Sequence, residues 1–499
     1  MLAIISDIHL TDGTSNATMA PGAFKLFAER LRDMAEAASW RLGDVYRPLE
    51  SVNLVLLGDM LDLIRSAKWL NSESVRPWDD INSAEGVRLI EEVTTSVLER
   101  NADALNTLRL ISAEGLRIPA ATSRGKPDRT RHEIVPVRTH YMVGNHDWFY
   151  HLNLPELTPA RRALVEKLGL ANKADMPFPH SPADDAELQD VMRRHRVFAR
   201  HGDIYDAFNF AGDRSASSLG DVVVIELLNR FASEISEQLV SELPAATLAG
   251  LGELDNLRPS LLAPIWIEGL LERSCPLPTQ RTKVKRTWDR LVDEFLEIPF
   301  IKEQDTWSPV DLVDSLQRVL KFSKLVSLGA AGKIVEWLER FGSGGDTSYY
   351  RYALGEQDFR NRRAKHIVYG HTHVAESVPL DASSAEGYAL NQLYFNSGTW
   401  RRVHRQTKFA PREHEFIAAE TMTYLAFFTG DERGGRSFET WCGTLAPEPE
   451  DASAYRLDPM NAPPVGTEPA RRAVPMPTPH FTPEGAPSRA PVAPRMKSL

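Results

Sequence analysis

Five short apolar runs each end in a cluster of acidic, amide or histidine residues, and this repeated arrangement constrains the fold most strongly. The runs read LAIIS, VNLVLL, THYMV, VFAR and HIVY, which is typical of buried β-strands. In chain order, the clusters are Asp7-Ile-His9, Gly58-Asp59 with Asp62, Gly144-Asn145-His146-Asp147, His201-Gly202-Asp203 and Gly370-His371-Thr372-His373. Helix caps and turns explain one or two such clusters, but not five. Because strands of an open α/β sheet present ligands at their carboxyl ends, the pattern predicts one shared site.

The first three runs alternate with amphipathic segments, at residues 24–38 and 84–110. Apolar residues recur there at helical spacing, so both segments are predicted to be helices. The resulting order β-α-β-α-β is typical of a layered α/β domain.

The pattern changes after about residue 210. Between about Leu219 and Phe341 the apolar residues recur at helical spacing, and strand-like runs return only with HIVY, QLYFNSGTW and TMTYLAFF. From Pro447 onward the chain holds thirteen of its 33 prolines, which predicts disorder. We therefore expect an α/β core in two parts (residues 1–210 and 351–445), a mostly helical insertion (211–350) and a disordered, Pro-rich tail (446–499).

Composition excludes several classes of protein. The only cysteines, Cys275 and Cys442, allow no disulfide framework and no thiolate metal site, which fits a reducing cytoplasm. The N-terminus MLAIISDIHL has no basic region and is predicted to be a strand, not a signal peptide. No run of 18 apolar residues predicts a membrane span. The net charge of −10 provides no general attraction for nucleic acid.

The residue types in the five clusters suit metal ions. His371 and His373 flank one threonine directly after a glycine, and neutral imidazole is the commonest metal ligand. At a strand end, residues two apart point the same way, so Asp7 and His9 are expected to meet one cation.

Taken in order, the patterns D-x-H, G-D-x-x-D, G-N-H-D, a single His and G-H-x-H resemble the calcineurin-like metallophosphoesterase superfamily. The resemblance covers roughly residues 1–210 and 360–445, and neither the helical tract nor the tail. It implies a four-layer α/β/β/α sandwich with a two-metal centre at the strand ends. It also implies that Asp7, His9, Asp59 and His373 hold one ion, and that Asp59 (bridging), Asn145, His201 and His371 hold the other.

The same resemblance implies an enzyme that hydrolyses a phosphate mono-, di- or pyrophosphate ester. Two divalent ions would share one hydroxide and clamp the phosphoryl oxygens. Mn²⁺ is the first expectation, while Fe and Zn²⁺ also suit these donors. His146 would protonate the leaving oxygen or stabilise transition-state charge, and Asp147 would orient its imidazole. Asp62 would steady a metal ligand; for both acids the alternative is a cap or turn role.

Differences between these motifs and those of known branches narrow the choice of branch within the superfamily. The Ser/Thr phosphatases carry R-G after G-D-x-x-D and Glu after G-N-H, where this chain has Leu63-Ile64 and Asp147. The UDP-2,3-diacylglucosamine pyrophosphatases typically have Arg at the position of His146, and the repair exonucleases lack such a helical insertion. Cyclic-nucleotide phosphodiesterases stay open. The expected substrate is a phosphorylated small molecule, a nucleotide or a lipid-linked phosphate. Nucleic acid is less favoured because the chain is acidic.

Several alternatives stay open at this point. The protein could be a metal-binding scaffold or adaptor with a vestigial site, or a nuclease of the same superfamily. The helical insertion could cap the substrate pocket, or form a separate bundle for oligomerisation or stability. Trp148 and Phe149 could stack on a base or belong to the core, and Asn396-Ser397-Gly398-Thr399 could approach phosphate or form only a turn. The oligomeric state is not indicated.

Overall fold

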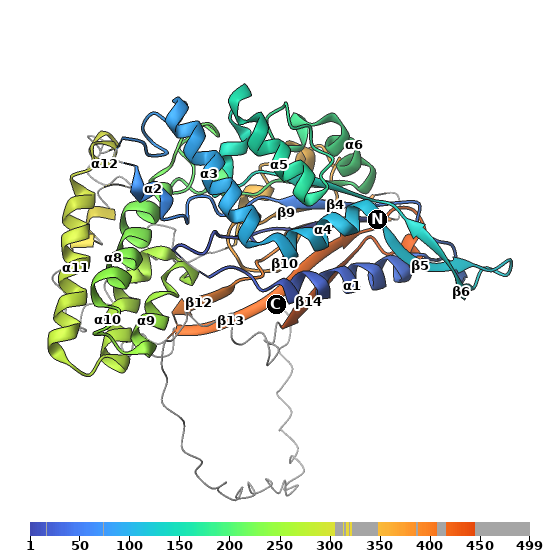
Figure 1. Cartoon of the computed structure of the whole chain (residues 1–499). Coiled ribbons are helices and arrows are strands. Elements are labelled where there is room, and N and C mark those ends of the chain that lie inside the picture. Colours follow the sequence, from blue (N-terminus) through green and yellow to red (C-terminus); the bar gives the residue numbers. More distant parts are fainter. Residues whose placement is uncertain are drawn as a thin grey trace, which may run out of the picture. The chain divides into compact units, whose positions relative to one another are not determined.

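Two β-sheets carry the five motifs in the computed structural model. It describes residues 1–304 apart from 16 and 73, then 313, 316–318, 320–321, 348–385, 388–406 and 416–444. The first sheet has the order β12-β13-β1-β4-β7, with β14 beside β13, and the second has the order β10-β11-β9-β8 (Figure 1). Their bounds are β1 (Leu2–Ile5), β4 (Val52–Leu57), β7 (Val137–Met142), β8 (Val197–Ala199), β9 (His366–Tyr369), β10 (Glu376–Ala385), β11 (Tyr388–Asn396), β12 (Arg402–Gln406), β13 (Phe416–Phe427) and β14 (Phe438–Thr444).

All five predicted strands are present, and each lies parallel to another of the five. β1 pairs with β4, β4 with β7, and β8 with β9, all in parallel register. The antiparallel partners β13, β14 and β12 complete the first sheet. The described part of the chain is therefore a mixed α/β fold with a mixed central sheet. Parallel pairing places the carboxyl ends of the motif-bearing strands on one edge of each sheet.

Helices α1 (Pro21–Ala38), α3 (Ala84–Arg100), α4 (Ala102–Glu114) and α5 (Thr158–Leu168) share one apolar cluster with the first sheet (Figure 1). The prediction of one helix over residues 84–110 is wrong, since α3 ends before Asn101 and α4 begins after it. The Asn101 amide donates to the carbonyl groups of Val97 and Thr11, which ties the break to the N-terminal loop. A side chain that bonds nearby backbone competes with helix continuation.

A second apolar cluster contains side chains of both sheets, including Ile4 and Val55 from the first and Val368 and Phe395 from the second. Helix α6 (Ala186–His195) adds Val191 and neighbours to this cluster. These contacts are the reason that the strands read as continuous apolar runs, because such strands are covered on both faces.

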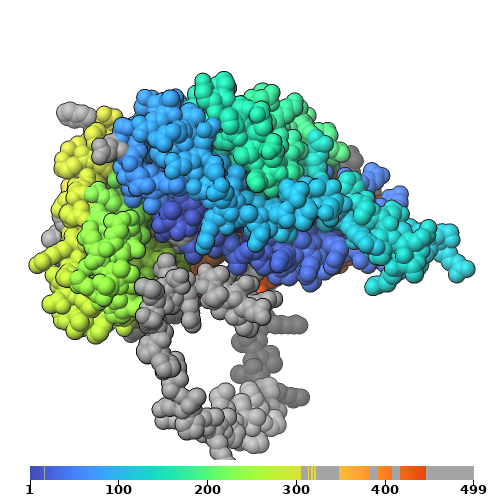
Figure 2. Space-filling model, in the orientation of Figure 1, coloured from blue at the N-terminus to red at the C-terminus, as the bar shows by residue number. Residues whose placement is uncertain are grey.

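The described part of residues 211–350 is mostly helical. It contains α7 (Leu219–Val222), the π-helical segment η5 (Val223–Asn229), α8 (Arg230–Leu239), α9 (Ala245–Leu251), α10 (Ala263–Ser274), α11 (Pro278–Leu296) and α12 (Pro299–Glu303). These helices bury an apolar cluster of their own, which includes Leu227, Phe231 and Ile235 of the predicted stripe. Figure 2 shows them in green and yellow beside the blue N-terminal residues. Asn229 anchors the insertion by donating to the Ile64 carbonyl over 2.7 Å.

Shorter elements complete the described chain. They are β2 (Trp40–Arg41), β3 (Val45–Tyr46), β5 (Leu116–Ala121), β6 (Pro127–Val135), α2 (Lys68–Asn71), α15 (Tyr350–Ala353), α16 (Gln357–Arg360), η1 (Trp148–His151), η2 (Pro155–Leu157), η3 (Pro182–Asp184), η4 (Asp203–Tyr205), η6 (Leu254–Asn256), η7 (Ser260–Leu262) and η10 (Glu432–Gly435). None of the helices in the described ranges is long and apolar enough to cross a bilayer. The predicted disordered tail, residues 446–499, lies outside the described residues.

Candidate metal centre

The five motifs, far apart in sequence, bring their histidine and aspartate side chains together. Potential ligand atoms lie within 4.8 Å of one another in three groups, two of which share His9, and every member except the partly buried His371 is buried. The groups are Asp7, His9 and His373; Asp59, His201 and His371; and His9, Asp62 and His146. The structure therefore contains buried His/Asp clusters next to β1 that are consistent with a metal site.

Five of these residues adopt left-handed backbone conformations. The φ angles are 53° at Asp7, 51° at His9, 53° at Asp59, 67° at His371 and 60° at His373. Residues with a Cβ rarely adopt such angles, and each instance costs about 1–3 kcal/mol. The expectation that strand geometry aligns Asp7 and His9 is wrong, because β1 ends at Ile5. Strained turns after β1, β4 and β9 direct these side chains inward instead.

Glycines in the motifs make room for candidate ligands of other motifs. A Cβ on Gly144 would collide with the Asp59 carboxylate and the His201 ring, and one on Gly370 would collide with the Asp7 carboxylate. A Cβ on Gly58 would collide with the His201 ring in the same way, and the φ of 83° at this position also favours glycine. The sequence predicted turns at these positions. The stronger reason for glycine is that residues from another strand end approach its Cα too closely for a side chain to fit.

Asp59 lies between His9, which groups with His373, and His201, which groups with His371. Its Oδ2 is 3.1 Å from His201 Nε2 and 3.7 Å from His9 Nε2. Its Oδ1 accepts the His146 backbone N–H over 2.8 Å. Burial raises the pKa of Asp59, but the charges of His201 and His146 outweigh burial and hold the pKa well below its usual range. An ionised carboxylate thus faces histidines from two different strand ends.

His9 and His373 face each other with their Nε2 atoms 3.0 Å apart. Asp7 Oδ1 lies 3.3 Å from His373 Nε2 and 3.9 Å from His9 Nε2. Burial lowers the pKa of His9 to about 4, and burial together with the charge of Arg258 holds the pKa of His373 well below its usual value. Both imidazoles are therefore neutral, which is the form that binds metals.

Asn145 lies between His201 and His371. Its Oδ1 is 3.2 Å from His201 Nε2 and 3.0 Å from His371 Nδ1. His201 Nδ1 lies 3.0 Å from the Leu57 carbonyl, so it carries the proton and Nε2 faces the cluster. Burial lowers the pKa of His201, but the charges of Asp59 and Asp7 raise it well above its usual value. A bound cation would take the place of that extra proton.

Asp62 connects His9 with His146. One oxygen lies 2.8 Å from His9 Nδ1 and the other 2.7 Å from His146 Nδ1. Burial lowers the pKa of His146, but the charges of Asp62 and Asp59 raise it above its usual value. The predicted role of Asp62 is to steady a metal ligand, and the candidate ligand that it contacts is His9.

Asp147 stabilises the loop instead of the imidazole. Its carboxylate accepts hydrogen bonds from the backbone N–H groups of Gly144 (2.6 Å) and Met60 (3.1 Å) and from the Tyr141 hydroxyl (2.6 Å). Burial raises the pKa of Asp147 to about 7. The prediction that Asp147 orients His146 is wrong, since Asp62 makes that contact. The alternative reading of Asp147 as a turn residue agrees with these bonds.

Two further alternatives are decided by packing. Trp148 and Phe149 are buried, with ring centroids 4.4 Å apart, so they belong to the core. Ser397 Oγ lies 2.6 Å from Ser6 Oγ, which in turn donates to Asp7, and the Asn396 amide donates to the Gly370 carbonyl over 2.6 Å. The segment from residue 396 to 399 therefore supports the loops that carry Asp7 and His371.

Asp206 was not among the predicted site residues, yet its Oδ2 lies 3.0 Å from His371 Nε2. A signal was present, because Gly202-Asp203-Ile-Tyr-Asp206 repeats the spacing of Gly58-Asp59-Met-Leu-Asp62. Arg258 in the helical insertion was not predicted either, and its Nη2 lies 2.9 Å from His373 Nδ1. No motif marks Arg258, so only the structure reveals that contact.

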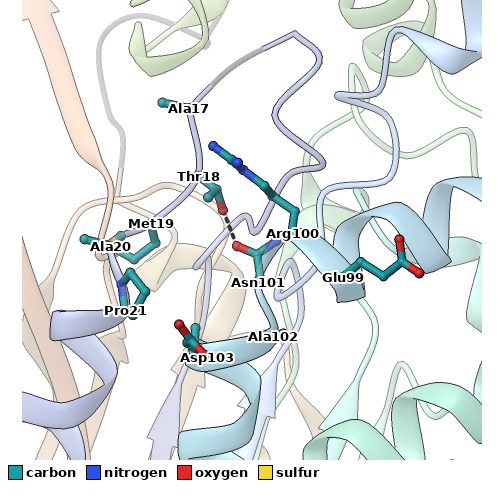
Figure 3. Close-up of a pocket in the computed structure, with 11 residues that line it drawn as sticks. Ala17, Thr18, Met19, Ala20, Pro21, Glu99, Arg100, Asn101, Ala102 and Asp103 are labelled. Atoms are coloured by element: carbon teal, nitrogen blue, oxygen red, sulfur yellow. Dashed lines mark hydrogen bonds between the residues drawn. The ribbon is translucent and has the colours of Figure 1, made fainter. Parts of the chain in front are cut away.

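A hollow of about 250 Å³ is lined by residues 17–21 and 99–104 (Figure 3). Thr18 donates to the Asn101 side chain across it. None of the five motifs lines this hollow.

A scan against models of known protein families finds no match for this chain, and a search of curated proteins finds no similar sequence. The resemblance therefore rests on the motifs and on the clusters that they form.

Proposed function

We propose that this protein is a metal-dependent phosphoesterase that resembles the calcineurin-like metallophosphoesterases and holds two divalent ions. One observation carries the proposal: the Asp59 carboxylate faces His9 and His201, which belong to separate groups of candidate ligands. A carboxylate in that position is suited to touch two cations and to offset their repulsion. The four-layer sandwich belongs to the same proposal, supported by apolar clusters on one face of the first sheet and between the sheets.

Seven residues would hold the ions. Asp7, His9, Asp59 and His373 suit one, and Asp59, Asn145, His201 and His371 suit the other, as the distances between their donor atoms allow. Oxygen and imidazole donors without thiolate favour Mn²⁺, with Fe and Zn²⁺ as alternatives. When bound, such a pair of ions lowers the pKa of water and neutralises charge on phosphoryl oxygens.

His146 is the proposed catalytic residue beside the ions. Its Nδ1 is held by Asp62, which leaves Nε2 for the substrate. Because the pKa of His146 is raised, the imidazole is protonated more fully near neutral pH than a free histidine. An imidazolium there can donate a proton to the leaving oxygen or stabilise charge on the phosphoryl group. Asp147 acts indirectly in this proposal, by fixing the loop that carries Asn145 and His146.

A panel of phosphomonoesters, phosphodiesters and pyrophosphates, each assayed with Mn²⁺, tests the proposed function. We expect hydrolysis of at least one class, together with about two ions per chain by elemental analysis. A protein that retains no metal after gel filtration, or that hydrolyses none of the panel with Mn²⁺, Fe²⁺ or Zn²⁺, would contradict the proposal. Binding of two ions without hydrolysis would favour the scaffold alternative.

A further inference from the structure

Three arginines from distant parts of the chain converge on the His9 and His373 side of the metal centre. Arg258 comes from the helical insertion, Arg65 follows the Asp62 loop, and Arg401 precedes β12. Arg258 Nη2 lies 2.9 Å from His373 Nδ1 and 3.1 Å from His373 Nε2. Arg401 Nη1 lies 3.5 Å from the His9 carbonyl oxygen. Arg65 is buried, and its charge acts on both of the other two guanidinium groups.

Backbone contacts hold Arg258 in this position. Its Nη1 donates to the carbonyl groups of Asp255 and Leu257, each over 2.8 Å. Its own backbone N–H donates to the His404 carbonyl over 3.0 Å, which joins the insertion to β12. The guanidinium is therefore oriented before any ligand binds, and preorganised donors lose little entropy on binding.

The positive charge of this group is only partly neutralised. Arg65 forms an ion pair with Asp255. Arg258 and Arg401 have no ion pair with a carboxylate among the described residues; their described contacts are to backbone carbonyls and to His373. Both guanidinium groups are charged at neutral pH, since arginine is not deprotonated in proteins. Partly buried charges without a partner are costly, which favours an anion between them.

A metal ion on His9 and His373 would add a further positive charge beside Arg258. Repulsion between the ion and the guanidinium is relieved when phosphoryl oxygens lie between them. A single phosphoryl group on the ions leaves Arg401 without an anion and leaves Arg65 with Asp255 as its one paired carboxylate among the described residues. A second phosphoryl group next to the first would meet them.

Resting on the proposed phosphoesterase function, we propose that Arg258, Arg401 and Arg65 form an anion subsite for a second phosphoryl group, so that the substrate contains a diphosphate. Arg258 contacts the phosphoryl group at the ions, and Arg401 and Arg65 contact its neighbour. The helical insertion thereby contributes to substrate selection through Arg258.

Calorimetric binding of two stable probes to the Mn²⁺-loaded protein tests this subsite. The probes are methylenediphosphonate, with two phosphoryl groups, and methylphosphonate, with one. Arg401→Gln should weaken the binding of methylenediphosphonate by about 10–100-fold and the binding of methylphosphonate by less than about threefold. Arg258→Lys should weaken both probes, because the paired N–H donors are lost while the charge remains. Metal content is measured for each variant after the titration.

The matched control is Arg402→Gln, since Arg402 neighbours Arg401 but pairs with Glu420 and Glu253. It should bind both probes as the unmodified protein does. If Arg401→Gln weakens the binding of both probes equally, the assignment of Arg401 to a second phosphoryl group is wrong. It is also wrong if Arg401→Gln weakens the binding of neither probe. Loss of metal in Arg258→Lys would show instead that Arg258 only supports His373. Calorimetry requires no turnover, so it tests the subsite separately from catalysis. If the protein is inactive but still binds methylenediphosphonate more tightly through Arg401, the proposed catalysis is refuted and the subsite is retained.

Discussion

Two loops of this protein have the same spacing and different surroundings. Acidic loop 1 (residues 58–62) and acidic loop 2 (residues 202–206) both read Gly-Asp-x-x-Asp, and their glycines have φ angles of 83° and 105°. In acidic loop 1, Asp59 is itself left-handed and faces His9 and His201. In acidic loop 2, Asp203 begins the 3-10 turn η4 and pairs with the buried Arg214.

The last residues of the two loops also differ. Asp62 is buried between His9 and His146, whereas the Asp206 side chain is 27% exposed and contacts His371 alone of the predicted site residues. In both loops, the Gly-Asp-x-x-Asp spacing positions the second carboxylate near a histidine. The backbone conformation of the first aspartate then decides whether it faces the candidate ligands.

The largest expected effect comes from Asp59→Asn. Because Asp59 faces both groups of ligands, this variant should lose both ions and all measurable hydrolysis. Asp203→Asn, at the equivalent position of acidic loop 2, should keep about two ions per chain by elemental analysis. Full metal content in Asp59→Asn would disprove the bridging assignment.

His146→Ala should keep both ions and lower kcat by about 10²–10⁴-fold, as expected for loss of a general acid. The loss should shrink for esters with leaving groups that need no proton, such as p-nitrophenol. An equal loss for all leaving groups would indicate stabilisation of phosphoryl charge instead. His132→Ala, on the exposed hairpin strand β6, is the control and should change neither quantity.

Asp203→Asn should lower the free energy of unfolding by about 3 kcal/mol, since it leaves the Arg214 charge buried without its partner. Urea denaturation measures this change. Asp213→Asn, an exposed neighbour in the same segment, should remain within about 0.5 kcal/mol of the unmodified protein. If Asp203→Asn is as stable as the control, acidic loop 2 is not held by this ion pair.

Asp62→Asn should weaken metal binding by about 10–100-fold, because one of its two imidazoles loses its acceptor. Asp206→Asn should weaken it by less than about tenfold, since the side chain is more exposed and contacts one imidazole. Competition with a metal-binding dye measures both constants. The reverse order of the two effects would show that acidic loop 2 supports the centre more strongly than acidic loop 1.

Much of the core was predictable from the chain alone. Strands such as β4 and β9 are covered on both faces, so their sequences are continuous apolar runs that stand out locally. The break between α3 and α4 was not predictable, because it depends on Asn101 bonding to Thr11, ninety residues away. Helical periodicity continues across that break and therefore conceals it.

The sequence by itself determined which residues gather, since the candidate ligands follow directly after strands and parallel strands end at a common edge. Tertiary structure decided what each residue does there. Asp62 and not Asp147 contacts His146, because the Asp147 carboxylate is already satisfied by the backbone of its own and a neighbouring loop. Arg258 reaches His373 only because the insertion is joined to β12, and such long-range contacts have no local periodicity or spacing from which to predict them.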